Sequence, residues 1–169
     1  MYIQTKRLEL KPIEQKDLPE LVELLTDPVV GKTYMVPDFE SKAQAEALAQ
    51  RIAAMSQGEE RYVAGIFLED RLIGMLNETE RMENGLEVGY AIDSRYHSRG
   101  YGTEALTGAI GFFHARGFRE VVAGAFEGNR ASLRIMEKSG MQRLEKEDTV
   151  TYRGQDHRCI YYAAKRETT

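Results

Sequence analysis

The sequence has almost no cysteine and no long apolar run. Cys159 is the only cysteine among 169 residues, so a disulfide framework and a zinc site built on several cysteines are excluded. The first residues hold no apolar core of the kind that a secretory signal needs. No run reaches the roughly 20 apolar residues of a membrane-spanning helix. We therefore expect a protein of a reducing, cytoplasmic setting, with no membrane partner.

Proline is scarce as well, with four residues, and the chain has no internal repeat, low-complexity tract or linker-like stretch. Hydrophobic residues make up 42% and charged residues 30% of the chain, which is typical of an ordered globular protein. A length of 169 residues matches that of one domain with a sizeable core. We expect a single domain over residues 1–169.

Positive charge is in the minority, since the net charge is −4, but it is unevenly spread. Between Ser94 and Arg143, eight Arg or Lys residues stand against four Glu, so this segment carries +4 and the remainder −8. A broadly basic surface is not expected, and we predict no nucleic-acid partner. The asymmetry favours an anionic ligand on one half and a cationic ligand on the other. Two solvated surfaces are the plainer alternative.

Apolar periodicity and capping signals divide the chain into seven strands and four helices. Strands are predicted at residues 5–13, 62–68, 72–78, 86–92, 121–126, 143–152 and 157–164, and helices at residues 18–25, 41–57, 103–116 and 129–139. Residues 86–126 form a strand–helix–strand unit, which requires a parallel pair, whereas hairpins join the strands before it. We predict a mixed α/β fold with a mostly antiparallel sheet of about seven strands and helices on both faces.

The most informative stretch is the loop that follows the strand at residues 86–92. It closes with Gly100-Tyr101-Gly102, where a helical pattern begins. Small residues let the backbone curl, so that several N–H groups converge, and the helix N-terminus adds positive potential. This pattern predicts a site for a phosphate-bearing ligand.

Two familiar phosphate loops fit this stretch less well. The chain has no GxxxxGK[ST] string, as a P-loop requires. Gly100-x-Gly102-x-x-Ala105 does match the dinucleotide pattern GxGxxA, and Glu127 lies at a suitable distance for a ribose contact. However, residues 93–99 separate the strand from the helix, and only one strand–helix–strand unit is present. A small nucleotide-dependent oxidoreductase remains an alternative.

A third interpretation uses more of the chain. The window HSRGYG, from His97 to Gly102, resembles the pyrophosphate loop Arg/Gln-x-x-Gly-x-Gly/Ala of the GNAT N-acetyltransferase family, with His97 in place of the usual first residue. Asn129-Arg-Ala-Ser132, followed by MEKSGM at residues 136–141, resembles the second helix of that family. The N-terminal TKRLELKPI is similar to the subgroup of ribosomal-protein N-terminal alanine acetyltransferases. The resemblance implies a GNAT-like fold and acetyl-CoA as co-substrate.

The resemblance also implies which residues bind coenzyme A. The loop N–H groups would hold the pyrophosphate, and the preceding strand would pair with the pantetheine arm through main-chain bonds from Ala91 or Ile92, between which the sequence does not decide. An asparagine would bond that arm besides capping its helix. The residues so implied are Ala91, Ile92, Arg95, His97, Arg99, Gly100, Tyr101, Gly102, Thr103 and Asn129. A turn, a helix cap and solvated arginines are the plainer interpretations of the same residues.

Two residues are candidates for proton transfer. Many members of the family place a tyrosine four residues after Ser132 to protonate the thiolate, but this chain has Met136 there. In the ribosomal-protein-like subgroup the serine is the proposed acid, so Ser132 is the candidate acid. Glu87, on the strand beside the expected acetyl group, is the candidate base if its pKa is raised, directly or through a water. Cys159 lies in no motif, and we therefore expect direct transfer in a ternary complex.

The acceptor is left open by the sequence. Residues 31–40 and 78–85 are expected to line its entrance, and the acidic remainder of the chain agrees with a cationic amine. A small-molecule amine and a protein N-terminus both fit, and the resemblance favours the protein N-terminus. A non-catalytic module that only binds coenzyme A is a further alternative. A monomer and a homodimer are equally compatible with the sequence.

Overall fold

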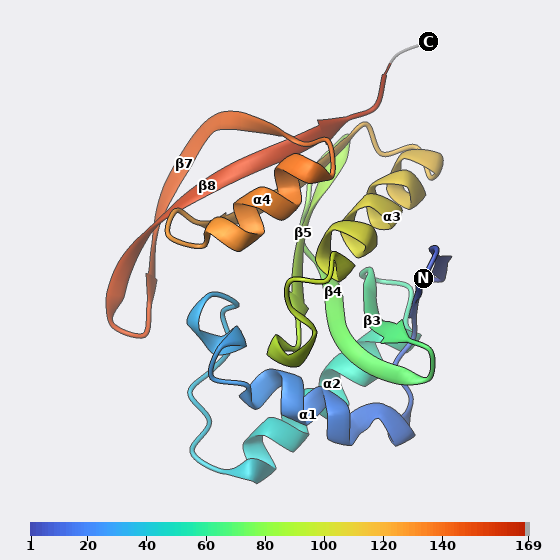
Figure 1. The fold of residues 1–169 in the computed structure, drawn as a ribbon, viewed down its shortest axis with the longest axis vertical. Helices are drawn as coiled ribbons and strands as arrows, with labels where there is room; N and C mark the ends of the chain where they lie inside the picture. Colours follow the sequence, from blue (N-terminus) through green and yellow to red (C-terminus); the bar gives the residue numbers. More distant parts are fainter. Residues whose placement is uncertain (168–169) are drawn as a thin grey trace.

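The computed structural model describes residues 1–167 as an eight-stranded sheet with α1 and α2 on one face and α3 and α4 on the other (Figure 1). The strands are β1 (Ile3–Gln4), β2 (Leu8–Lys11), β3 (Val63–Leu68), β4 (Arg71–Arg81), β5 (Gly85–Ile92), β6 (Glu120–Phe126), β7 (Gln142–Tyr152) and β8 (Gln155–Lys165). The helices are α1 (Leu18–Thr26), α2 (Lys42–Gln57), α3 (Tyr101–Ala115) and α4 (Arg130–Lys138). None of the helices in this part of the chain is long and apolar enough to cross a bilayer.

The strands lie in the order β1-β2-β3-β4-β5-β6-β8-β7. Every neighbouring pair is antiparallel except β5 and β6. This arrangement confirms the mixed, mostly antiparallel sheet and the parallel strand–helix–strand unit that the sequence predicts. The β7–β8 hairpin forms one end of the sheet, with β7 outermost (Figure 1).

Alternating side chains of the strands separate two main cores. On β3, Ile66 lies in a buried cluster with Leu106 and Phe113 of α3, whereas its neighbour Phe67 lies in another cluster with Leu24 of α1. Burying each large apolar side chain stabilises the fold by about 1.5–3 kcal/mol. The sheet is therefore held from both faces, and its strands have little freedom to shift register.

Local signals set the helix boundaries. The Ser41 Oγ accepts the Gln44 N–H at 3.3 Å at the start of α2, and the Asn129 Oδ1 accepts the Ser132 N–H at 3.2 Å at the start of α4. Both caps agree with the predicted helices. Helix α3 begins two residues earlier than expected, because Gly100 takes up a φ of +82° that allows the chain to turn directly into the helix.

The N-terminal strand differs from its prediction. Residues 5–13 are predicted as one strand, whereas the structure forms β1 and β2 around a turn in which the Thr5 N–H donates to the Leu8 carbonyl at 2.9 Å. Ile3, Leu8 and Leu10 are all buried, but β1 has only two residues and is therefore too short to show an apolar pattern of its own. The sheet consequently has eight strands rather than about seven.

The parallel pair is short. Strands β5 and β6 are in register from Gly85–Glu120 to Glu87–Val122, although β5 continues to Ile92 and β6 to Phe126. Beyond Glu87 each strand keeps only its antiparallel neighbour, β4 or β8. The two strands therefore part, and the edge of β5 that faces β6 is left open.

We predict that Gly74→Ala destabilises the fold, because Gly74 of β4 lies against the backbone of β5. An added methyl group would overlap the Ala91 carbonyl oxygen and lie 2.9 Å from Cδ1 of Ile92. Overpacking of this kind costs about 1–3 kcal/mol, which urea denaturation measures as a lower midpoint. Gly111→Ala is the matched control, since no atom lies within 4 Å of its added methyl group. Equal midpoints for the two variants would contradict the prediction.

Candidate active site

The candidate site lies where β5 and β6 part. Helix α3 follows β5 and α4 follows β6, so both helices begin near the carboxyl ends of the two parallel strands. A Cβ at Gly102 of α3 would lie 2.7 Å from Cδ1 of Ile135 on α4. The two helices thus pack closely at Gly102, and a side chain there would require the end of the Ile135 side chain to move. Neighbouring helix N-termini favour an anion through their dipoles.

The loop before α3 presents a row of backbone donors. Ser98 and Gly100 have φ angles of +61° and +82°, and Arg99 between them has a negative φ. Such alternation turns successive N–H groups toward one side. Within residues 1–167, the N–H groups of residues 98–103 make no hydrogen bond. This concave set of donors fits a pyrophosphate group.

Arg7, which the sequence analysis does not single out, braces this loop from the β1–β2 turn. Its Nη1 donates to the Arg99 carbonyl at 3.1 Å, and its Nε pairs with Glu104 at 2.7 Å. The guanidinium also lies 4.5 Å from the ring centroid of Tyr101. No local motif could reveal this role, because the contacts join segments more than 90 residues apart. The loop is therefore held in shape by the protein itself.

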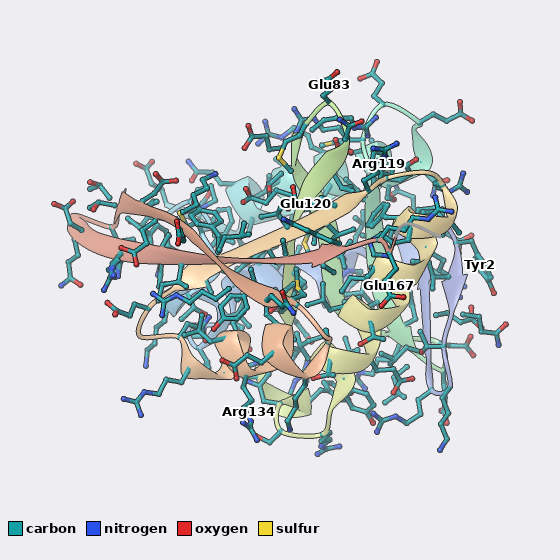
Figure 2. All side chains as sticks on the ribbon, turned by 90° about the horizontal axis from the view of Figure 1, so that it is seen from above. Tyr2, Glu83, Arg119, Glu120, Arg134 and Glu167 are labelled. Carbon is teal, nitrogen blue, oxygen red and sulfur yellow. The ribbon has the colours of Figure 1, made fainter. Side chains whose placement is uncertain are left out.

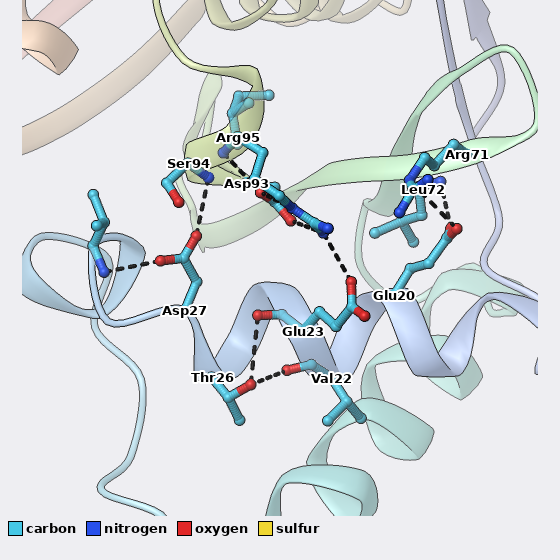
Figure 3. Close-up of polar contacts among 12 residues, drawn as sticks. Glu20, Val22, Glu23, Thr26, Asp27, Arg71, Leu72, Asp93, Ser94 and Arg95 are labelled. Atoms are coloured by element: carbon cyan, nitrogen blue, oxygen red, sulfur yellow. Dashed lines mark hydrogen bonds and ion pairs between the residues drawn. The ribbon is translucent and has the colours of Figure 1, made fainter.

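Arg95 lies on the α1 side of the sheet rather than among the loop donors. Its Nη2 is 2.7 Å from Asp93 and 2.8 Å from Glu23 of α1 (Figure 3). Hydrogen bonds to these two carboxylates raise the pKa of Arg95. The structure thus places Arg95 in an ion-pair cluster that fastens β5 to α1. Arg99, in contrast, is exposed within the loop itself.

The other loop residues that the sequence analysis names have distinct surroundings. The His97 Nε2 lies 2.6 Å from the Ile92 carbonyl oxygen and so ties the loop to the end of β5. Tyr101 is buried beneath the guanidinium of Arg7. Thr103 is partly buried in the first turn of α3. Of these residues, Tyr101 and Thr103 face the site through their N–H groups.

The backbone of β5 points alternately to its two neighbours, and this separates Ala91 from Ile92. The Asp93 N–H donates to the Ile73 carbonyl of β4 at 2.8 Å, so Ala91, two residues earlier, also turns its backbone groups toward β4. Ile92 and Tyr90 turn theirs toward the open edge. Of the two main-chain donors that the sequence analysis names, Ile92 faces the gap and Ala91 does not.

The start of α4 reaches β5 through a side-chain contact. The Ser132 Oγ lies 2.7 Å from the phenol oxygen of Tyr90. Burial raises the pKa of Tyr90 to about 12, so the phenol keeps its proton. Met136, which replaces the family's tyrosine, is fully buried. Tyr90 escapes the sequence analysis because an aromatic residue in a strand is ordinarily a core residue.

Glu87 lies at the last paired position of β5 and β6, with its side chain on the face opposite to that of Tyr90. Burial raises the pKa of Glu87, and the nearby carboxylates Glu80 and Asp148 raise it further, while the charge of Lys146 opposes them. A partly buried carboxylate with a raised pKa suits a general base.

The segment between α1 and α2, which includes part of the predicted entrance, contacts the β7–β8 hairpin. The Tyr152 hydroxyl donates to the Gly31 carbonyl at 2.6 Å, and Arg153 pairs with Asp38 at 3.0 Å. The β7–β8 turn thereby holds the segment between α1 and α2, which the sequence analysis does not anticipate. Seen from above, Glu83 of the β4–β5 turn and Arg134 of α4 lie on opposite sides of the molecule (Figure 2).

Comparisons with known proteins agree with this geometry. Residues 7–142 match the family described as acetyltransferase (GNAT) domain. The uncharacterized N-acetyltransferase YoaA of Bacillus subtilis is 27% identical over 146 residues, which cover 83% of this chain and 82% of YoaA. A GNAT-family acetyltransferase structure from Bacillus anthracis has a TM-score of 0.83 at 22% identity, with 98% of each chain covered. The RimL ribosomal L7/L12 α-N-protein acetyltransferase in complex with coenzyme A has a TM-score of 0.82 at 19% identity, again with 98% of each chain covered.

The family match contains the elements that build the candidate site. It includes Arg7, strand β5 with Glu87, the loop at residues 98–103 and helix α4 with Ser132. It excludes most of the β7–β8 hairpin, which contacts the segment between α1 and α2. The predicted family is therefore confirmed: the chain belongs to the GNAT acetyltransferase family.

Proposed function

We propose that this acetyltransferase moves the acetyl group of acetyl-CoA to a primary amine by direct attack in a ternary complex. The observation that carries the proposal is the gap between β5 and β6, with loop donors beside it and Glu87 at its closed end. Acetyl-CoA supplies a thioester, which is open to attack by an uncharged amine. The RimL structure contains coenzyme A, which supports the choice of donor for this fold.

The residues at the gap fit coenzyme A in three ways. The N–H groups of residues 98–103 would hold the pyrophosphate, and the exposed Arg99 would add positive charge. The open backbone groups of Tyr90 and the N–H of Ile92 would bond the amides of the pantetheine arm as an added strand does, since the Ile92 carbonyl is already bonded to His97. Asn129 would meet the same arm from the start of α4. One of these N–H groups on β5 would polarise the thioester carbonyl.

Glu87 would take the proton that the acceptor amine loses. An α-amine has a pKa of about 7.7–8.0 and a lysine amine about 10.4, so an α-amine needs far less help from a base. Burial holds the pKa of Glu87 above its usual value, which brings it closer to that of an α-amine. The carboxylates of Glu80 and Asp148 would attract the ammonium form to the entrance.

Ser132 would return a proton to the departing sulfur. When Tyr90 donates to the Ser132 Oγ, the Ser132 hydroxyl proton is free to turn toward the gap. A thiol pKa of about 8.5 means that a strong acid is not required. Burial raises the pKa of the Cys159 thiol, which disfavours the thiolate that an acyl-enzyme route would need. These features favour direct transfer.

A nucleotide-dependent oxidoreductase is disfavoured, because the residue expected to contact the ribose is paired with another side chain. Glu127, which would serve a ribose, pairs with Arg158 at 3.0 Å on the β7–β8 hairpin. Gly102, which the dinucleotide pattern needs for a ligand, lies against Ile135. The family match favours acetyl transfer over both this alternative and a non-catalytic module.

The first test is calorimetric titration of Gly100→Val with acetyl-CoA, with NADH and ATP as controls. We expect micromolar binding of acetyl-CoA by the wild type and a loss of about 100-fold in the variant, because valine disfavours the φ of +82° that shapes the loop. Gly117→Val is the matched control, since Gly117 has a φ of +97° at the other end of α3. Absence of acetyl-CoA binding by the folded wild type would sink the proposal.

Glu87→Gln should lower kcat/KM at pH 7 by about 100-fold or more, the usual scale of general base catalysis. The difference in kcat/KM between the variant and the wild type should decrease as pH rises, because the acceptor amine then loses its proton unaided. Since the folded-state pKa of Glu87 is raised, its charged form costs stability above that pKa, and the variant should unfold no more easily than the wild type at neutral pH. Glu59→Gln, at an exposed carboxylate between α2 and β3, is the control. If the pH–rate profiles of the wild type and Glu87→Gln run parallel to each other, Glu87 is not the base.

Ser132→Ala and Tyr90→Phe should lower kcat with little change in the KM for acetyl-CoA. We expect kcat to fall by about 100-fold in Ser132→Ala, on the scale of general acid catalysis. The decrease should be smaller in Tyr90→Phe, about 10-fold, because Tyr90 acts through Ser132. Cys159→Ala should keep the wild-type rate and serves as the control. Loss of turnover in folded Cys159→Ala would instead support an acyl-enzyme route.

A further inference from the structure

We propose that the acceptor is the N-terminal residue of a peptide or protein, and that its side chain is bulky and apolar. This inference depends on the acetyl transfer proposed above and adds the class of acceptor. It rests on a cavity beside the candidate site that the acetyl-transfer mechanism does not use.

The cavity has a volume of about 230 Å³ and lies between α2, the segment before α2 and the sheet. Its lining is apolar except for Tyr34 and Asn77. Sites that enclose a whole small ligand are usually about 300–1,000 Å³, so this cavity suits one side chain of a larger molecule. Met35 and Met55 lie at its mouth and are 56% and 47% exposed. Flexible thioethers adapt to apolar groups of different shape.

The polar end of the cavity adjoins the open strand. Asn77 pairs with Gly89 of β5. A Cβ at Gly89 would lie 3.4 Å from the Asn77 Oδ1 and 3.7 Å from Cε2 of Tyr34. Tyr34 and Asn77 are joined by a hydrogen bond of 2.7 Å. The cavity therefore begins on the face of β5 that also carries Glu87, two residues along the strand.

The spacing decides the size of the side chain. Neighbouring strands are about 4.8 Å apart and alternate residues about 7 Å apart. An α-amine placed between Glu87 and Gly89 thus lies about one strand spacing from Asn77, at the polar end of the cavity. A leucine, methionine or phenylalanine side chain spans this distance, whereas an alanine methyl group does not. The cavity consequently favours a larger first residue than the alanine that the sequence resemblance implies.

Polar groups around the cavity favour a peptide over a free amino acid. The Asn77 Nδ2 makes no hydrogen bond to any residue in the described part of the chain, so it can donate to the carbonyl of the acceptor's first residue. The carboxylates of Glu80, Glu87 and Asp148 lie near one another, with Lys146 as the nearby cation. This negative excess attracts the N-terminal ammonium but repels the carboxylate of a free amino acid.

The test compares short peptides that differ only in the first residue: leucine, methionine or phenylalanine against alanine or serine, with free leucine as a separate arm. Two quantities are measured, kcat/KM by release of coenzyme A thiol and the Kd of each peptide for the coenzyme-A-bound enzyme by calorimetry. We expect peptides with a bulky apolar first residue to have a kcat/KM about 10-fold or more higher than the alanine peptide and a Kd about 10-fold or more lower, since each buried methylene contributes substantially to discrimination. Free leucine should react poorly.

Two variants assign the effect to the cavity. Met55→Lys places a charge at the mouth of the cavity. It should weaken binding of the leucine peptide by about 10-fold and leave the Kd of the alanine peptide unchanged. Val29→Lys is the matched control, because Val29 is 48% exposed and lies outside the cavity. Met55→Leu should retain the preference.

The outcomes separate this inference from the proposed function. Turnover of alanine and leucine peptides at equal rates, unaffected by Met55→Lys, would overturn the role of the cavity and leave acetyl transfer standing. Free leucine reacting as well as the leucine peptide would overturn the choice of a peptide. A folded enzyme that fails to bind acetyl-CoA would overturn the proposed function, and this inference with it.

Discussion

The parting of β5 from β6 is the constraint on which the rest of the site depends. The parallel ladder ends at Glu87–Val122, while longer antiparallel ladders to β4 and β8 hold the two strands on their outer sides. Helices cover both faces of the sheet, and each strand is paired along its length with its outer neighbour, so the gap is part of the packed fold. Open backbone groups, which would be costly if merely buried, are thereby kept beside the N-termini of α3 and α4.

The alternation of β5 then divides the proposed chemistry between two faces. Tyr90 points to the face of α3 and α4 and contacts Ser132, whereas Glu87 points to the face of α1 and α2. A proton could accordingly be accepted on one face and returned on the other, with the thioester between them. The same alternation turns the Ile92 N–H toward the gap and the backbone groups of Ala91 toward β4. A strand one residue out of register would exchange all these roles.

Local signals account for the parts of the site that lie close together in the sequence. The glycine loop, the Asn129 cap and the Glu87 strand were all predictable, because each depends on backbone conformation or alternation over a few residues. Residues whose role depends on partners far away in the sequence could not be predicted. Arg95 has the charge expected of a phosphate ligand but pairs with Glu23 of α1, and Arg7 has no motif although it braces the loop. Tyr90 becomes a candidate functional residue only through its contact with Ser132.

The sequence alone determined the class of fold, the parallel unit at residues 86–126 and the glycine loop before α3, since periodicity, capping residues and glycines act over short distances. It could not reveal the short strand β1 at Ile3–Gln4 or the turn that separates it from β2, because two residues are too few to show a pattern. Only the tertiary structure decided where the parallel pair ends, which face each residue of β5 serves, and that Tyr34, Asn77 and Met55 share a cavity beside it. These features arise from packing between elements far apart in the chain, and such packing leaves no local pattern to be detected.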